Sequence, residues 1–247
     1  MLGLPDQITA CLFDLDGVLT QTAKVHAKAW KQTFDEYLER RAKQRGEEFR
    51  PFDLKADYDE YVDGLPRYDG VRNFLASRDI ELPQGAPSDS PDAETIDGIG
   101  NRKNELVLHL IHDQGVDPYE GSVRYVHAAL DNELRCAVVS SSTNCRDVLT
   151  AAGIIDLFEE IVDGTIIDRE GLKGKPAPDT FLAGARALGV EAGQATVFED
   201  ALAGVAAGRA GDFGYVVGVD RTGQAAALKD HGADVVVEDL AELLNDR

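Results

Sequence analysis

Residues 8–18 read ITACLFDLDGV, and the interpretation of the whole chain starts from this stretch. Its apolar first part, followed by Gly17, predicts a buried strand that ends in a turn. Asp14 and Asp16 stand at the end of that strand. An isolated Asp-x-Asp at a strand end often serves only as a turn or a helix cap. Its meaning therefore depends on what the other strands carry.

Comparable apolar runs recur later in the chain and predict further strands. They are Cys136–Ser140, Thr196–Phe198, Tyr215–Val219 and Val235–Val237, with Ile161–Val162 as a weaker candidate. Helix-like stretches alternate with these runs, and each is followed by a glycine that can end a helix in the left-handed conformation. These stretches are Asn144–Ala152, Asp179–Leu188 and Leu202–Ala210. The alternation predicts an α/β fold, a Rossmann-like parallel sheet covered by helices on both faces.

Residues 22–113 interrupt this alternation because they contain no comparable strand run. Within them, Leu82–Ala93 is rich in Pro, Ser, Asp and Gly and is typical of a loop. Helical patterns occupy His26–Arg41, Tyr68–Ser77 and Arg102–His112. We therefore expect a small helical cap domain at 22–113, inserted after the first strand of a core domain formed by 1–21 and 114–247.

The composition limits the partners and the compartment. The 247 residues carry 25 Lys and Arg against 45 Asp and Glu, a net charge of −20, which argues against nucleic acids and anionic membrane surfaces as partners. No run approaches the roughly 20 apolar residues of a membrane span, and Pro5 and Asp6 interrupt the region where a signal peptide has its apolar segment. The three cysteines form no CxxC motif, and the two that lie inside apolar strand-like runs are expected to be small core residues in a reducing compartment. We expect a cytoplasmic protein.

Polar residues follow several of the predicted strands, at the sheet edge where open parallel sheets bind ligands. They are Asp14 and Asp16, then Ser140, Ser142 and Asn144, then Glu199 and Asp200, with Lys175 in a loop before a predicted helix. Taken singly, each has a structural explanation as a helix cap, a first-turn acid or a solvated lysine. Their joint occurrence at successive strand ends favours a functional site.

The residue types indicate phosphoryl transfer. Aspartate is a covalent phosphoryl acceptor, which makes Asp14 the candidate nucleophile and Asp16 the candidate general acid/base. The Ser140 hydroxyl and the Lys175 ammonium can stabilise charge on the transferring group. Carboxylates together with a substrate phosphate are ligands that Mg²⁺ prefers. The candidate metal ligands are Asp14, Asp16, Glu199 and Asp200.

These motifs, in this order, resemble those of the haloacid dehalogenase superfamily and, within it, the beta-phosphoglucomutase-like group. The resemblance extends over nearly the whole chain. It includes Thr22-Ala23, His26, Ala29 and Trp30 in the first cap segment, Gly64–Arg67 in a cap loop, and Arg102-Lys103-Asn104 in a third cap segment.

The resemblance implies a Rossmann-like core with a helical cap and an aspartyl phosphate formed on Asp14. It implies that Mg²⁺ is held by Asp14, the backbone carbonyl of Asp16 and Asp200, with Glu199 assisting. It further implies that a second phosphate is held by Arg67, Ser142 and Asn144, and that the sugar side of the cap includes His26, Gly64, Lys103 and Asn104. Trp30 is a further substrate-binding candidate, although packing is the favoured interpretation for a tryptophan on a helix.

The cap residues favour a mutase that interconverts beta-glucose 1-phosphate and glucose 6-phosphate. The alternatives are a phosphatase of small sugar phosphates and, with less support, an inactive sugar-phosphate-binding module. Thr143 stands where sugar-phosphate mutases commonly carry a lysine, and Gln21 stands where an aspartate is common. The expected partner is a small phosphorylated sugar, and the expected assembly is a monomer or a small homo-oligomer.

Overall fold

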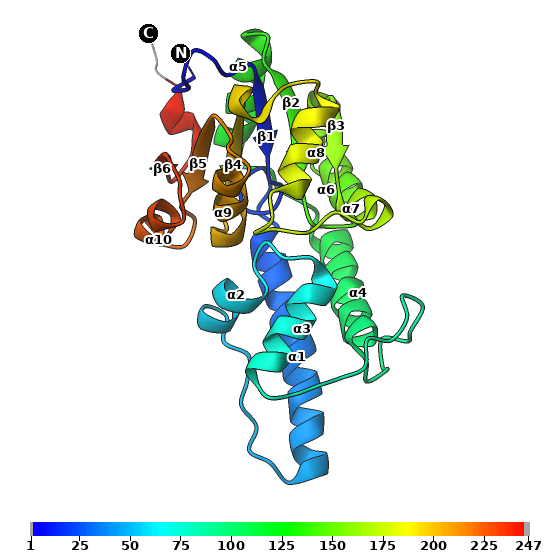
Figure 1. Ribbon diagram of the computed structural model, residues 1–247. Helices are drawn as coiled ribbons and strands as arrows, with labels where there is room; N and C mark the ends of the chain where they lie inside the picture. The colour runs from blue at the N-terminus through cyan, green and yellow to red at the C-terminus, as the bar shows by residue number, and fades with distance from the viewer. Residues whose placement is uncertain (1, 245–247) are drawn as a thin grey trace. The chain divides into compact units, whose positions relative to one another are not determined.

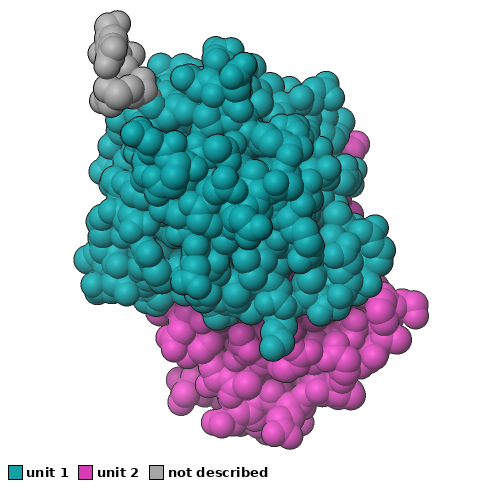
Figure 2. Space-filling view, turned by 45° about the horizontal axis from the view of Figure 1, so that its top comes forward, with its two compact units in different colours: residues 1–21, 116–247 teal, residues 22–115 magenta. Residues whose placement is uncertain are grey.

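A computed structural model describes residues 2–244, and the chain divides into two compact units (Figure 2). The sheet unit comprises residues 1–21 and 116–247, and the helical unit comprises residues 22–115. The second boundary lies between Gly115 and Val116, two residues beyond the expected one. None of the helices within residues 2–244 combines the length and the apolar character needed to cross a membrane.

The sheet unit is built on six parallel strands in the order β3-β2-β1-β4-β5-β6 (Figure 1). The strands are β1 (Ala10–Phe13), β2 (Arg135–Val139), β3 (Glu160–Val162), β4 (Ala195–Glu199), β5 (Tyr215–Val219) and β6 (Val235–Val237). This arrangement confirms the predicted α/β fold, including the weak candidate at Ile161–Val162. Strands β1 and β4 lie at the centre, where all their residues are buried.

Helices cover both faces of the sheet, which explains why the strands are apolar on both sides. The helices of this unit are α5 (Glu120–Asp131), α6 (Cys145–Ala151), α7 (Gly164–Glu170), α8 (Asp179–Ala187), α9 (Leu202–Ala210) and α10 (Ala225–Asp230). Three short 3₁₀ helices are η1 (Ile155–Leu157), η2 (Ala192–Gln194) and η3 (Leu240–Leu243). Figure 1 shows α8 and α9 on one face.

Alternate residues of each strand point to opposite faces of the sheet and pack into two separate core layers. Leu12 and Val197 belong to the layer with Phe181 of α8. On the other face, the Phe13 ring stacks on Phe198 with centroids 4.5 Å apart, and Tyr125 of α5 lies 5.2 Å from Phe198. Cys11, Cys136 and Cys145 are buried and free, as expected for core cysteines.

The helical unit contains four helices around an aromatic core. They are α1 (Ala23–Arg45), α2 (Ala56–Tyr61), α3 (Arg67–Ser77) and α4 (Ile96–Gln114). The Phe34 ring of α1 lies 4.2 Å from Phe74 of α3, and Phe52 of the connecting segment lies 5.0 Å from Phe74. The expected loop at Leu82–Ala93 contains no helix or strand.

The prediction that the third cap helix begins at Arg102 is wrong, because α4 begins at Ile96. Thr95 caps it by accepting a hydrogen bond from the Gly98 backbone at 2.9 Å. Gly98 and Gly100 lower helix propensity, but close packing requires both. A Cβ on Gly98 would lie 2.4 Å from the Ala93 carbonyl oxygen, and one on Gly100 would lie 2.7 Å from the Tyr68 ring.

Candidate active site

The carboxyl ends of three neighbouring strands carry Asp14, Ser140 and Glu199. Asp14 follows β1, Ser140 follows β2, and Glu199 is the last residue of β4. All three are buried, with 7%, 2% and 1% of their surfaces exposed. The Asp14 backbone donates to the Phe198 carbonyl at 3.0 Å, which fixes the β1 end against β4. The parallel sheet therefore brings these polar groups to one edge.

Lys175 links two of these carboxylates. Its Nζ lies 2.5 Å from Asp14 Oδ1 and 2.5 Å from Glu199 Oε1, and it donates to the Val139 carbonyl at 3.3 Å. The lysine side chain is 1% exposed. A buried ammonium is tolerated only where charged or polar partners replace its water. The loop between α7 and α8 thus delivers one cation to two acids.

The pKa values of this cluster follow from burial and from the sharing of one cation. Burial raises the pKa of Asp14, with Lys175 opposing and the negative charge of Asp16 adding to the rise. Burial also raises the pKa of Glu199 to about 7, again opposed by Lys175. Burial alone would lower the pKa of Lys175, but the two carboxylates outweigh it and raise the pKa. Lys175 is therefore the fixed positive charge of the cluster.

Asp14, Glu199 and Asp200 form a carboxylate set that fits a divalent cation. One oxygen from each lies within 4.8 Å of the others. An all-oxygen donor set is the type that Mg²⁺ and Ca²⁺ take. Glu199 has a second task, because its Oε2 accepts from the Ala201 backbone at 2.9 Å while Oε1 holds Lys175. Asp16 follows on the segment after β1 and is partly exposed.

Gly17 brings the segment after β1 into contact with Asp200. Its φ is +85°, and a Cβ at this position would lie 1.7 Å from Asp200 Oδ2. Any side chain at Gly17 would therefore displace the Asp200 carboxylate. The turn predicted from this glycine also has a role in positioning the acidic residue after β4.

We expect Gly17→Ala to weaken Mg²⁺ binding and lower activity by at least about tenfold, because the methyl group pushes Asp200 away. Gly46→Ala is the matched control. Gly46 has a φ of +68° with nothing within 4 Å of the added Cβ. It should cost about 1–2 kcal/mol of stability from backbone strain alone and leave Mg²⁺ affinity unchanged. Calorimetric titration with Mg²⁺ measures both variants, and equal affinities would contradict this role for Gly17.

The segment after β2 holds Ser140, Ser142 and Asn144 in one hydrogen-bonded turn. Ser140 Oγ accepts from the Ser142 backbone at 3.1 Å, and Ser142 Oγ accepts from the Asn144 backbone at 3.2 Å. Asn144 is the N-cap residue of α6. Arg146 pairs with Asp163 at 3.4 Å. These serine side chains therefore shape the backbone, as well as presenting hydroxyl groups at the sheet edge.

In the helical unit, His26 of α1 and Lys103 of α4 lie side by side. Lys103 Nζ is 3.0 Å from His26 Nδ1, and Lys103 is only 6% exposed. Lys103 Nζ also lies 4.9 Å from the centre of the Trp30 ring. Burial lowers the pKa of His26 well below its usual range, and the Lys103 charge lowers it further. His26 is accordingly a neutral imidazole in the folded protein near pH 7.

We expect His26→Gln to reduce the acid sensitivity of the fold. Because the folded state holds His26 neutral, the unfolded chain binds more protons, and wild-type stability falls as the pH drops below the unfolded pKa near 6.5, by at most about 1.4 kcal/mol per pH unit. Between about pH 7 and pH 5.5, the free energy of unfolding should therefore fall less in His26→Gln than in the wild type. Exposed His231 gives a control, His231→Gln. The expectation would be contradicted if the free energies of unfolding of wild type and His26→Gln differed by the same amount at both pH values.

The remaining predicted cap residues lie on α1, α3, α4 and the turn before α3. Arg67 is the first residue of α3; its Nη2 donates to Tyr68 Oη at 3.0 Å, and its guanidinium lies over the Tyr68 ring. Gly64 has a φ of +69° in the turn before it. Asn104 follows Lys103 on α4. Trp30 is 3% exposed and stacks on Phe34 at 5.0 Å, which favours packing over a sugar contact.

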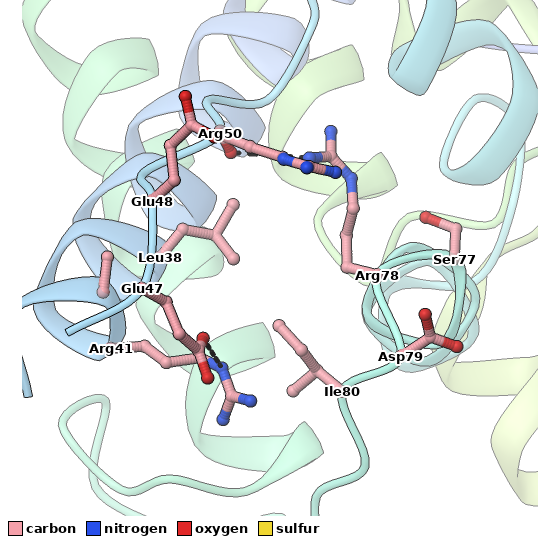
Figure 3. A pocket seen from close by; sticks show the side chains of 10 residues that line it. Leu38, Arg41, Glu47, Glu48, Arg50, Ser77, Arg78, Asp79 and Ile80 are labelled. Carbon is pink, nitrogen blue, oxygen red and sulfur yellow. Dashed lines mark hydrogen bonds and ion pairs between the residues drawn. The ribbon is translucent and has the colours of Figure 1, made fainter. Parts of the chain in front are cut away.

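A hollow of about 300 Å³ lies elsewhere in the helical unit, between the end of α1, the loop after it and the end of α3 (Figure 3). Two of the three arginines that line it have acidic partners, since Arg41 lies 3.7 Å from Glu47 and Arg78 lies 2.6 Å from Asp57. None of the predicted site residues lines this hollow.

Two residues that lie near the site were not identified from the sequence. Arg221 donates to the Gly17 carbonyl at 2.8 Å, and Gln224 donates to the Asp200 carbonyl at 3.0 Å. Both lie in the loop after β5, a strand that the sequence predicts correctly. They could have been found by considering the polar residues that follow this strand, as was done for the other strands.

Comparisons with known proteins show the family of this chain. A family model described as haloacid dehalogenase-like hydrolase matches residues 8–212. A beta-phosphoglucomutase of Mycobacterium bovis is 57% identical over 247 residues, covering 99% of this chain and 94% of that protein. A beta-phosphoglucomutase of Bacillus subtilis is 32% identical over 235 residues, 95% of this chain and 91% of that protein.

A solved structure extends the likeness to the fold. The crystal structure of beta-phosphoglucomutase from Clostridium difficile superposes with a TM-score of 0.75 at 27% identity, covering 96% of this chain and 93% of that one. The order of the motifs, the sheet and the family match lead to the same conclusion: the chain belongs to the haloacid dehalogenase-like hydrolase family of enzymes.

Proposed function

We propose that this protein is a mutase that interconverts beta-glucose 1-phosphate and glucose 6-phosphate, primed by glucose 1,6-bisphosphate. The likeness to a beta-phosphoglucomutase at 57% identity over almost the full chain carries the proposal. The buried cluster of Asp14, Lys175 and Glu199 supports the phosphoryl-transfer chemistry of this proposal, because it joins a candidate nucleophile to a fixed positive charge.

In the first half-reaction, a carboxylate oxygen of Asp14 attacks the phosphorus of the bisphosphate. The O–P bond to the sugar breaks, and Asp16 gives its proton to the departing sugar oxygen. Lys175 and Ser140 stabilise the negative charge on the transferring group. The enzyme then holds an aspartyl phosphate on Asp14, and Asp16 is ionised.

In the second half-reaction, a sugar hydroxyl takes the phosphoryl group from Asp14. Asp16 removes the hydroxyl proton as the oxygen attacks phosphorus, and the Asp14 carboxylate is released. Mg²⁺, held by Asp14, the Asp16 carbonyl and Asp200 with Glu199 assisting, would supply the positive charge that offsets the substrate phosphate. In the helical unit, Arg67 would bind the second phosphate, a role suited to a bidentate guanidinium.

A phosphatase uses the same first half-reaction but delivers the phosphoryl group to water. The two functions therefore differ in their products, and a mutase needs a closed site that excludes water from the intermediate. His26, Lys103 and Asn104, with Arg67, favour the mutase because they supply sugar and phosphate contacts in the helical unit. Ser142 and Asn144 would add contacts from the sheet unit.

The test is an assay with purified protein, Mg²⁺, beta-glucose 1-phosphate and a trace of glucose 1,6-bisphosphate. Glucose 6-phosphate and free phosphate are followed separately. We expect glucose 6-phosphate as the main product, at a rate that depends on the bisphosphate. Free phosphate as the main product would replace the mutase with the phosphatase, and binding of sugar phosphates without turnover would indicate an inactive binding module.

A further inference from the structure

We propose that the loop after β5, residues 220–224, is a clamp that positions the metal-binding groups, with Arg221 and Gln224 as its positioning residues. The inference rests on the proposed function, since it concerns the metal site used there. Arg221 Nε donates to the Gly17 carbonyl at 2.8 Å, and Gln224 Nε2 donates to the Asp200 carbonyl at 3.0 Å. One short loop thus holds both the segment after β1 and the segment after β4.

The two held segments supply groups of the proposed metal site. The Gly17 carbonyl belongs to the peptide directly after the Asp16 carbonyl, one of the proposed ligands. Asp200 provides a carboxylate to the cluster with Asp14 and Glu199. Gly17 and Asp200 also touch, since a Cβ on Gly17 would overlap Asp200 Oδ2. A shift of either segment would change the separation between the Asp16 carbonyl and the Asp200 carboxylate.

The clamp loop is itself held rigidly by Asp220. Its Oδ1 accepts from the backbones of Thr222, Gly223 and Gln224 at 3.2, 2.7 and 2.8 Å, and its Oδ2 accepts from Ala225 at 3.0 Å. The Asp220 backbone donates to Val237 of β6 at 2.8 Å. The loop is therefore anchored to the sheet before it reaches the site.

The Arg221 guanidinium is held by several contacts. Its guanidinium carbon lies 3.6 Å from the centre of the Tyr119 ring, and its Nη1 donates to the Glu238 carbonyl at 2.5 Å. The side chain is 15% exposed. Its Nη1 also lies 3.7 Å from Asp239 Oδ2. These contacts hold the guanidinium in the orientation in which Nε donates to the Gly17 carbonyl, as a positioning residue requires.

Arg209 provides a matched control in the same unit. It donates to the Gly232 carbonyl through Nε and Nη2 at 3.1 and 2.6 Å and pairs with Asp234 at 2.7 Å. Arg221 likewise contacts a glycine carbonyl and an acid, since it donates to Gly17 and lies 3.7 Å from Asp239. Arg209 holds the end of α9 to the segment before β6, and neither of these carries a proposed site residue.

The experiment measures the dissociation constant of Mg²⁺ alone by calorimetry, with thermal melting of each protein. We expect Arg221→Ala and Gln224→Ala each to weaken Mg²⁺ binding by at least about tenfold, the usual effect of losing a group that orients a metal ligand. Arg209→Ala should lower the melting temperature and keep the wild-type dissociation constant. Gln224→Ala removes only a side-chain amide, so its Mg²⁺ affinity can still test the proposal if Arg221→Ala folds poorly.

Wild-type affinity for Mg²⁺ in both Arg221→Ala and Gln224→Ala would overturn the clamp proposal and leave the proposed function standing. Failure of the wild-type protein to bind Mg²⁺ would instead overturn the metal-dependent function, and the clamp with it. In the active protein, the variants should also need a higher Mg²⁺ concentration for half-maximal rate. Excess Mg²⁺ should restore much of their maximal rate, which a purely structural defect would not allow.

Discussion

Asp14→Asn is expected to lower the turnover of beta-glucose 1-phosphate by about 10⁴-fold or more, the scale seen when an enzyme loses its nucleophile. Asparagine has nearly the same shape, so the buried position after β1 stays filled. Its amide cannot form the acyl phosphate at Asp14 that both half-reactions need. The variant should also accumulate no covalent phosphate when incubated with glucose 1,6-bisphosphate and Mg²⁺, as measured by intact-protein mass spectrometry.

The control for this variant is Asp97→Asn. Asp97 is also buried, at 2% exposed, and accepts a hydrogen bond from Gln84 at 2.8 Å in the helical unit. Its substitution alters a buried aspartate that has no proposed chemical role, so activity should stay within a few-fold of wild type. Covalent phosphate or turnover persisting in Asp14→Asn would remove Asp14 as the nucleophile.

Lys175→Met is expected to abolish activity and to lower the free energy of unfolding by about 3–5 kcal/mol, the cost of breaking a buried ion pair from one side. The lysine is the cation shared by Asp14 and Glu199. Without it, two carboxylates remain buried side by side, and like charges there oppose ionisation. Chemical denaturation near neutral pH and the mutase assay measure the two effects.

Two further variants separate the charge effect from the loss of packing. Lys43→Met removes a lysine from an exposed pair with Glu39 and should change stability by well under 1 kcal/mol. Lys175→Met combined with Glu199→Gln removes one of the two carboxylates that are left buried without a cation, and it should recover part of the lost stability. A Lys175→Met protein as stable as wild type, or a double variant less stable than the single one, would show that the cluster is not held together by charge.

The strands could be predicted well because burial on both faces requires a continuous run of apolar residues, which is visible in the sequence. Tyr215–Val219 and Val235–Val237 form β5 and β6 with the predicted bounds. Short helices lack such a signal: α2 and α10 have six residues each, too few for an apolar period to show. The start of α4 was missed because Gly98 and Gly100 disfavour a helix locally, while close packing against Ala93 and Tyr68 requires them.

Only the part of the site that lies at the ends of the strands could be predicted from the sequence. Parallel strands place their carboxyl ends at one edge, so Asp14, Ser140 and Glu199 were expected together. That Glu199 divides its oxygens between Lys175 and the Ala201 backbone depends on side-chain positions that no spacing reveals. The same holds for Arg221, which reaches Gly17 from more than 200 residues away in sequence.

The central claim is that the phosphoryl group on Asp14 returns to a sugar and not to water. The reaction of beta-glucose 1-phosphate in H₂¹⁸O, with Mg²⁺ and glucose 1,6-bisphosphate, tests it most directly by mass spectrometry of the products. The mutase predicts glucose 6-phosphate with no ¹⁸O in its phosphate and little free phosphate. Free phosphate carrying ¹⁸O as the main product would contradict it, because water would then be the group that attacks the aspartyl phosphate.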